Sequence, residues 1–331
     1  MRGLSPIFIV GSPRSGTTLL RNMLNRHPAI AICLETQFSR LIYARRRAFG
    51  DLSDLRKRER LVKEYLSTER VKRMQMDLPA LEERLLREGV SCEAFFTSFL
   101  RFYAEANGKR RCGEKTPGHA LFLGTLCQWY PDAFIIHILR DPRDVVASLV
   151  RMPSKPKNVL ANADVWVRLN LGAWRARQYP RYLPVRYEEL AMQPEEEIRR
   201  ICAFIGEEYS SSMLVASPDW QSPNAWHRRA QEPVTTARLG KWREYLTAEQ
   251  VALIEWKVGP HMQRFGYEPV GCAPSSLSVG RELMKGAVDS LTRHIGEFPA
   301  AWYSLIRSPN ISREEAARGR FRRHVAFPTN P

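Results

Sequence analysis

"IFIVGSPRSGTTLLRNML", residues 7–24, passes from four apolar residues into a turn rich in glycine and serine, and then into a helical pattern. A strand, a glycine turn and a helix in this order are typical of a phosphate-binding loop, because backbone N–H groups and the helix dipole face the anion. A turn that merely precedes a helix is the alternative. The upstream strand and the Thr-Thr-Leu-Leu helix start favour the binding interpretation.

The loop departs from the triphosphate-binding pattern at one position. Gly11 and Gly16 have the spacing of Gly-x-x-x-x-Gly-Lys-Ser/Thr, but Thr17 stands where that pattern has its lysine. Arg14 lies inside the loop instead. Loss of the lysine predicts a ligand with less charge at the transferring end and no metal requirement. A sulfuryl group fits, because it carries one negative charge where a terminal phosphoryl group carries about two.

Apolar runs alternate with helical patterns along the rest of the chain, which predicts an α/β fold. A mostly helical stretch interrupts this alternation, and a segment rich in proline, glycine and serine follows Val270. We therefore expect a domain over 1–270 with a helical insertion at about 38–107, and a helical appendage with a basic tail over 271–331. The expected strands are 6–10, 29–35, 111–117, 133–139 and 182–190, and the expected helices include 17–25, 119–129 and one that starts near 142.

Composition limits the class of protein. The 331 residues are 44% apolar, which is enough for a full core. No run of about 18 apolar residues occurs, so no transmembrane helix is expected, and no signal-peptide pattern precedes the first strand. The six cysteines are scattered without a Cys-x-x-Cys pair, which predicts reduced thiols in a cytoplasmic protein without a cysteine-bound metal.

The net charge of +16 favours anionic partners. Nucleic acid is not expected among them, because no basic motif interleaved with aromatic residues appears. The basic stretches 40–73 and 313–323 can be a solvated helical face and a frayed tail, and for the tail this interpretation is preferred. Helical spacing over 279–306 predicts a helix that packs on the parent domain or on a second subunit. Attachment to anionic lipid is the alternative, which the moderate hydrophobicity disfavours.

Three motifs together carry a resemblance to a known family: "FIVGSPRSGTTLLRNML" (8–24), "GEKTP" (113–117) and "ILRDPRDVVASL" (138–149). Over about residues 6–268 the chain resembles the sulfotransferases that use 3′-phosphoadenosine-5′-phosphosulfate (PAPS), in the branch of the tyrosylprotein and many bacterial enzymes. The resemblance implies a metal-free, P-loop-like fold around a parallel sheet flanked by helices. It also implies a 5′-phosphosulfate loop made of Arg14, Ser15, Gly16, Thr17 and Thr18.

The second strand–helix junction is the expected 3′-phosphate site. Arg140 ends an apolar strand, and Ser148 follows eight residues later in the next helix. Family members hold the 3′-phosphate with an arginine and a serine at this spacing, and the two types supply charge-assisted and hydroxyl donors. A surface ion-pair cluster is the alternative. We interpret Arg143 and Asp144 as no more than such a cluster.

Three further residues match cofactor contacts of the family. Tyr187 in "VRYEEL" corresponds to a tyrosine that contacts adenine. The segment "TTARLGKWREYL" (235–246) resembles the family's late cofactor-closing segment, in which Arg238 and Lys241 would reach the nucleotide. A half-buried tyrosine at a strand end is, however, also common for packing reasons alone.

A hydroxyl acceptor must lose its proton as the new bond forms, so a base is expected within reach. Glu35 corresponds to the glutamate base of the tyrosylprotein enzymes, although Leu34 replaces the first acid of their Glu-Glu-Thr motif. A capping or ion-paired carboxylate is the alternative role. His119 is the rival base by analogy with the cytosolic enzymes, or else it lines the pocket or begins the following helix.

Two cations complete the expected catalytic set. Lys115 matches a family lysine near the oxygen that bridges sulfate and phosphate, where a cation offsets developing charge. Arg14 faces the leaving phosphate or the transferring group from inside the loop.

These observations predict an enzyme that moves the sulfuryl group of PAPS, in line and with a general base, to a hydroxyl or amine acceptor, leaving 3′,5′-adenosine bisphosphate. A phosphate-loop kinase or nucleotidase and a non-catalytic nucleotide-binding protein are the alternatives. A carbohydrate, a lipid, a phenol and a peptide tyrosine all stay open as acceptors, and so does a homo-oligomer.

Overall fold

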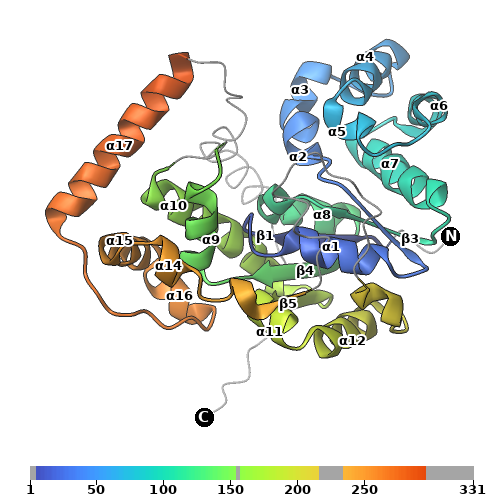
Figure 1. Cartoon of the computed structure of the whole chain (residues 1–331). Coiled ribbons are helices and arrows are strands. Elements are labelled where there is room, and N and C mark those ends of the chain that lie inside the picture. The colour runs from blue at the N-terminus through green and yellow to red at the C-terminus, as the bar shows by residue number, and fades with distance from the viewer. Residues whose placement is uncertain (1–4, 154–156, 216–233, 296–331) are drawn as a thin grey trace, which may run out of the picture. The chain divides into compact units, whose positions relative to one another are not determined.

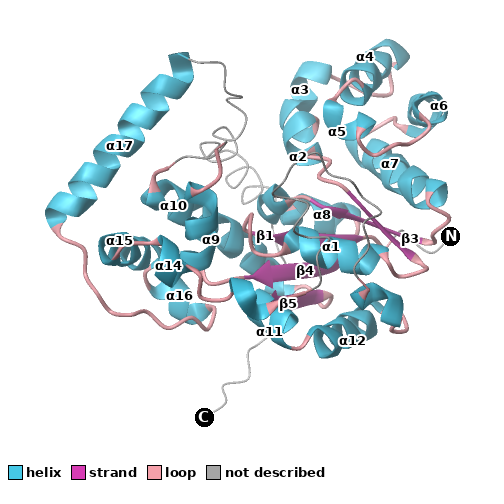
Figure 2. Ribbon diagram, viewed as in Figure 1, coloured by secondary structure: helices cyan, strands magenta, loops and turns pink. Residues whose placement is uncertain are grey.

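Five parallel strands form a central sheet in the order β2-β3-β1-β4-β5 (Figure 2). The computed structural model describes residues 5–153, 157–215 and 234–295, with side chains described as far as residue 286. The predicted strands and the α/β class are confirmed. The strands are β1 (Ile7–Gly11), β2 (Ile30–Cys33), β3 (Arg111–Lys115), β4 (Phe134–Leu139) and β5 (Tyr182–Arg186).

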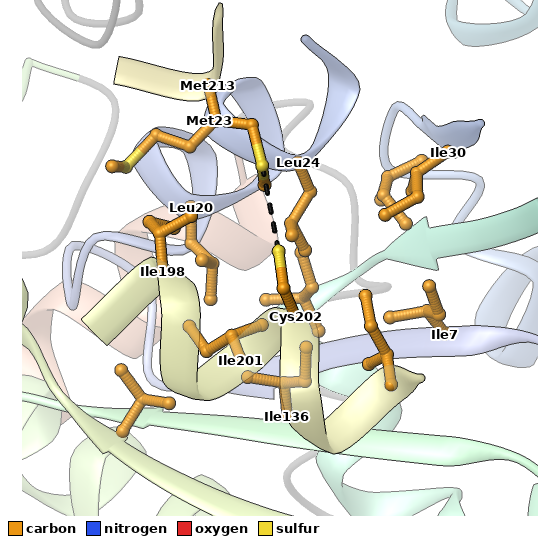
Figure 3. Close-up of a cluster of buried hydrophobic side chains, with 14 of the residues drawn as sticks. Ile7, Leu20, Met23, Leu24, Ile30, Ile136, Ile198, Ile201, Cys202 and Met213 are labelled. Carbon is orange, nitrogen blue, oxygen red and sulfur yellow. Dashed lines mark hydrogen bonds between the residues drawn. The ribbon is translucent and has the colours of Figure 1, made fainter. Parts of the chain in front are cut away.

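Both faces of the sheet are covered, which is why the central strands are apolar without alternation. On one face, α1 (Thr17–Asn25) and α12 (Pro194–Ile205) bury a cluster of aliphatic side chains, in which Cys202 packs on Met213 (Figure 3). On the other face, Phe8 of β1 stacks on Phe96 with ring centroids 6.3 Å apart. These two layers fix β1 in the middle of the core.

The segment between β2 and β3 is mostly helical (Figure 1). Its longer helices begin at residues that cap them: Asp54, Asp77 and Ser91 each accept a hydrogen bond from a backbone N–H in the first turn. The helices here are α2 (Phe38–Leu41), α3 (Arg46–Phe49), α4 (Leu55–Leu66), α5 (Glu69–Lys72), α6 (Leu78–Glu88) and α7 (Cys92–Ala106).

The remaining described helices follow β3, β4 and β5. They are α8 (Leu123–Trp129), α9 (Pro142–Val150), α10 (Val159–Trp174), α11 (Tyr187–Met192), α12, α14 (Trp242–Tyr245), α15 (Ala248–Val258), α16 (Pro260–Arg264) and α17 (Ser276–Ile295). Short 3₁₀ turns are η1 (Tyr43–Arg45), η2 (Pro117–Leu121), η3 (Arg175–Gln178), η4 (Ser211–Leu214) and η5 (Thr236–Arg238). Within the described residues, no helix is both long and apolar enough to cross a membrane.

Helix α17 is anchored at the start of α10. Asn158 donates a hydrogen bond to the Glu282 carbonyl at 2.6 Å, and the Val159 N–H donates to the Glu282 carboxylate at 2.9 Å. Contacts within the chain divide it after Phe298, so α17 belongs to the same compact unit as the sheet. The predicted domain boundary at residue 270 stays a prediction, and the basic tail 313–323 lies outside the described residues.

The strand order positions the expected site. Strand β1 lies between β3 and β4, and all four strand pairings of the sheet are parallel. The loop after β1 therefore emerges at the centre of the carboxyl edge, between connections that diverge to opposite sides. This is the point at which open α/β sheets bind their ligands.

Candidate active site

The loop after β1 has a backbone that only glycine can supply at two positions. Gly11 has φ 140°, and a Cβ there would lie 2.3 Å from the Ile138 carbonyl oxygen. Gly16 has φ 94°, and a Cβ there would lie 2.4 Å from the ring of Tyr187. Both glycines are therefore needed for the turn itself and for close packing around it.

The start of α1 presents unsatisfied donors. Gly16 precedes the helix in a left-handed conformation, and no side chain caps the first turn. Ser15 is fully buried and its hydroxyl has no hydrogen-bond partner. Thr17 is buried and Thr18 is half-buried at the first two helical positions. An anion at this helix end would satisfy these groups together.

Arg14 joins the loop to α9. Its φ is 71°, in the region that L-residues rarely adopt, and its Nε donates a hydrogen bond to Ser148 Oγ at 3.0 Å. The predicted 5′ loop and the predicted 3′-phosphate serine therefore lie side by side.

Arg140 ties together three segments of the chain. Its guanidinium donates to the carbonyl of Arg14 at 3.1 Å and to the carbonyl of Arg238 at 2.7 Å. The same group lies over the Tyr187 ring, with 4.3 Å between the guanidinium carbon and the ring centroid. Its Nε is buried and has no hydrogen-bond partner. The structure thus gathers Arg140, Tyr187 and the backbone of the loop at one place.

Arg143 and Asp144 are buried, so their interpretation as a surface cluster is wrong. Arg143 pairs with Asp141 at 2.7 Å and with Glu255 at 2.9 Å. Asp144 accepts hydrogen bonds from the N–H groups of Gly240 and Trp242. Burial raises the pKa of the Asp144 carboxyl above its usual range, and Arg140 and the two N–H donors oppose that rise.

A second group of side chains stands at the ends of β2 and β3. Lys115, the last residue of β3, is buried, and its Nζ lies 2.6 Å from Glu35 Oε1. The Glu35 side chain is 30% exposed, and Arg70 of α5 lies 3.8 Å from its other oxygen. The two predicted catalytic residues are therefore in contact. Arg70 belongs to no motif in the sequence, and only the fold of the insertion brings it there.

His119 stands in a different environment. It is fully buried in η2, its Nε2 accepts a hydrogen bond from the Ser39 N–H, and its Nδ1 lies 2.8 Å from Glu114 Oε2. An Nε2 that accepts places the ring proton on Nδ1, which then faces the carboxylate. The other oxygen of Glu114 accepts hydrogen bonds from the N–H and the hydroxyl of Thr36, each at 2.9 Å.

The late segment contributes through its backbone. The carbonyl of Arg238 meets Arg140, whereas the ammonium group of Lys241 pairs with Glu244 in α14. Trp242 is buried and packs with Ala147 of α9 and Val251 of α15. In the described part of the chain, no group of three or more His, Cys, Asp or Glu side chains is arranged to hold a metal ion.

Comparison with known proteins gives consistent matches. A model of the sulfotransferase family matches residues 6–211. Protein-tyrosine sulfotransferase 2 of Gallus gallus is 25% identical over 289 residues, covering 81% of this chain and 71% of that protein. Omega-hydroxy-beta-dihydromenaquinone-9 sulfotransferase Stf3 of Mycobacterium bovis is 27% identical over 320 residues, covering 82% and 78%.

A solved structure shares the fold. The sulfotransferase domain of the Synechococcus PCC 7002 olefin synthase superposes with a TM-score of 0.59 at 21% identity, over 81% of this chain and 98% of that domain. The parallel sheet and the helices that flank it are therefore common to both.

Proposed function

This chain belongs to the sulfotransferase family and is an enzyme of sulfuryl transfer, and from that premise we propose that its donor is PAPS and that Glu35 is its general base. The observation that carries the proposal is the contact between Lys115 Nζ and Glu35 Oε1, at 2.6 Å, at the end of β3, the strand next to β1 and its loop. The comparisons do not support a kinase, a nucleotidase or a non-catalytic protein.

The residues around the loop fit a nucleotide with phosphates at both ends. PAPS supplies a sulfuryl group joined to a phosphate that leaves readily. The open N–H groups of α1 and the unpartnered Ser15 hydroxyl suit its 5′ side. The unpartnered Nε of Arg140 and the hydroxyl of Ser148 suit its 3′-phosphate. Buried donors without partners are costly, and an anion would satisfy them.

Glu35 and Lys115 have complementary tasks at the reacting centre. Glu35 has a partly exposed carboxylate, which can reach the hydroxyl of an acceptor and take its proton as the oxygen–sulfur bond forms. Lys115 is held in place by burial, and its positive charge counters the charge that develops on the leaving oxygen. Arg14 supplies a further cation from the loop.

The names of the relatives indicate a hydroxyl-bearing acceptor but no single class of molecule. The Gallus gallus protein is named for tyrosine in proteins and the Mycobacterium bovis protein for a hydroxyl group on a dihydromenaquinone. A phenol or peptide tyrosine and a lipid alcohol are therefore the first acceptors to test, before carbohydrates. A cytoplasmic location and a homo-oligomer stay predictions.

Thermal stability tests the donor. We expect 3′,5′-adenosine bisphosphate to raise the melting temperature without added metal, and ATP with magnesium to raise it much less, since the loop lacks the triphosphate lysine. Arg140→Ala should lower the affinity for the bisphosphate far more than the affinity for 5′-AMP, which has no 3′-phosphate. Arg181→Ala, an exposed arginine that pairs with Asp132, is the matched control and should change neither.

Two results would contradict this assignment. One is equal stabilisation by ATP, or stabilisation that requires magnesium. The other is an equal loss of affinity for the bisphosphate and for 5′-AMP in Arg140→Ala. Transfer of labelled sulfate from PAPS into an extract of the source cells, with identification of the product by mass, then names the acceptor.

A further inference from the structure

The segment 238–242 is held to the start of α9 through its backbone. Asp144 Oδ2 accepts the Gly240 N–H at 3.0 Å, and Asp144 Oδ1 accepts the Trp242 N–H at 2.9 Å. Arg140, four residues earlier, donates to the Arg238 carbonyl at 2.7 Å. Two side chains of one helix start therefore bind the backbone of a segment about a hundred residues away in sequence.

The geometry of the segment itself depends on these contacts. Gly240 has φ 68°, which L side chains rarely adopt, so the segment turns sharply between the two N–H groups that Asp144 accepts. Two guanidinium groups lie over the Trp242 ring, that of Arg143 at 4.4 Å and that of Arg243 at 4.3 Å from its centroid. Arg143 is itself fixed by Glu255, so one side of the ring rests on a rigid support.

Asp144 also faces the residue that suits the donor's 3′-phosphate. Its Oδ2 lies 3.5 Å from an Nη atom of Arg140, the same nitrogen that donates to Arg238. Asp144 is 4% exposed, so water cannot replace it as the acceptor for these groups. The contacts to Arg14, Arg238 and Asp144 use three of the five guanidinium N–H groups, so the unpartnered Nε and one N–H of the Nη that binds Arg14 remain for a ligand.

We propose that Asp144 is a positioning residue that couples the place of the 238–242 segment to binding of the donor's 3′-phosphate by Arg140. The proposal rests on the proposed function, in which Arg140 receives that phosphate. Asp144 fixes the segment and orients Arg140 at once, so a ligand that uses Arg140 strengthens the hold on the segment. A ligand without a 3′-phosphate gains nothing from this coupling, because it makes no use of Arg140.

Asp144→Asn tests the coupling. An amide keeps the size of the side chain but turns an N–H₂ group toward one of the two backbone donors, and it removes the charge that faces Arg140. We expect the affinity for 3′,5′-adenosine bisphosphate to fall about 10- to 100-fold, the loss of one or two hydrogen bonds to a charged group, with 5′-AMP nearly unaffected. Asp164→Asn is the matched control, because this carboxylate of α10 pairs with Lys257 and touches no part of the segment.

Limited proteolysis reads the segment directly. Trypsin cleaves after Arg238, Lys241 and Arg243, and mass spectrometry identifies each cut. We expect bisphosphate to protect these bonds in the wild-type protein and in Asp164→Asn, and to protect them only at much higher concentration in Asp144→Asn. 5′-AMP should protect them weakly in all three proteins.

A second variant keeps the test decisive if Asp144→Asn does not fold. Gly240→Ala leaves α9 intact and strains only the segment, since its Cβ would lie 2.7 Å from an Arg243 nitrogen. It should show the same selective loss of bisphosphate affinity. Two results would overturn the coupling. One is an equal loss of affinity for the bisphosphate and for 5′-AMP in these variants, and the other is a tryptic cleavage pattern of the wild-type protein that the bisphosphate does not change.

Failure of the proposed function has a different signature. If the wild-type protein does not bind bisphosphate more tightly than 5′-AMP, the donor assignment and the coupling both fall. If that preference is present and depends on Arg140 but survives in Asp144→Asn and in Gly240→Ala, only the coupling is wrong.

Discussion

Lys115 with Glu35 and His119 with Glu114 are two pairs of a carboxylate with a nitrogen-bearing side chain near the ends of β2 and β3, and they differ in what surrounds them. Glu35 is 30% exposed and touches Lys115 at 2.6 Å. His119 and Glu114 are almost completely buried, and their polar atoms face the chain around Thr36 and Ser39. Glu114 and Lys115 are consecutive in one strand, so their side chains point to opposite faces of the sheet.

This difference in exposure decides which pair can react with an incoming molecule. A proton acceptor must come within hydrogen-bond distance of the group it deprotonates. Glu35 has open surface for that approach, whereas the nitrogen atoms of His119 face a backbone N–H and a carboxylate inside the protein. The first pair is therefore interpreted as the catalytic one, and the second as a support that holds the ends of the strands together.

The largest expected effect comes from breaking the first pair. Lys115→Met keeps the length of the side chain and removes the charge, so turnover should fall about 10²- to 10³-fold, as for loss of one preorganised electrostatic group. The melting temperature should change little, because Glu35 can be solvated. Lys109→Met is the control, since this half-buried lysine binds the Asn25 carbonyl before β3 begins. Steady-state turnover is measured for both variants. Equal turnover of Lys115→Met and Lys109→Met would refute the role of Lys115.

His137 is a second buried histidine, and unlike His119 it has only neutral hydrogen-bond partners, Tyr182 and Asn170. Burial lowers the pKa of His137 from 6.5 to about 4, although a hydrogen bond from its ring to Asn170 works in the other direction. Its neutral form therefore stabilises the native state fully above pH 6.5, and this contribution is lost as the pH falls toward 4. The loss amounts to about 3 kcal/mol over that range.

Urea unfolding at several pH values measures this effect. In His137→Gln, which keeps polar atoms for Tyr182 and Asn170, the free energy of unfolding should depend much less on pH between 6.5 and 4. If variant and wild type lose stability in parallel over that range, His137 is not the titrating group.

A smaller effect is expected from breaking the second pair. Glu114→Gln puts an amide N–H₂ group against either His119 or Thr36, so the free energy of unfolding should fall by about 2 kcal/mol. Turnover per folded molecule should stay near the wild-type value. Glu105→Gln, an exposed carboxylate that pairs with Arg84, should cost less than about 0.5 kcal/mol. A stable Glu114→Gln with greatly reduced turnover would move this pair into the catalytic machinery.

The sequence predicted what depends on neighbours in the chain. The strand, glycine turn and helix over 7–24 are local, and the structure has β1, the loop and α1 where the pattern placed them. The apolar run before Arg140 is local in the same way, and it predicts β4. Glu35 and Lys115 were each predicted from a motif, and their contact follows once β2 and β3 are known to be neighbours.

The rest depends on contacts between distant residues, for which the sequence carries no local signal. In the sequence, Asp144 is one member of the charged run over 140–144. Only the fold brings Gly240 and Trp242 to it. Arg70 lies in a helical insertion without a motif and reaches Glu35 through the packing of α5. The burial of His119 likewise comes from tertiary packing around η2, which spacing alone does not report.

Single-turnover transfer from PAPS to the acceptor identified by labelled sulfate, measured in Glu35→Gln and His119→Asn, tests the assignment of the base most directly. Both substitutions remove one basic atom and keep a polar side chain, and bisphosphate binding serves as the control for an intact donor site. We expect Glu35→Gln to slow the chemical step about 10²- to 10⁴-fold with bisphosphate binding intact, and His119→Asn to lower stability while the step stays near the wild-type rate. A nearly active Glu35→Gln with an inactive but folded His119→Asn would contradict the account and make the histidine the base.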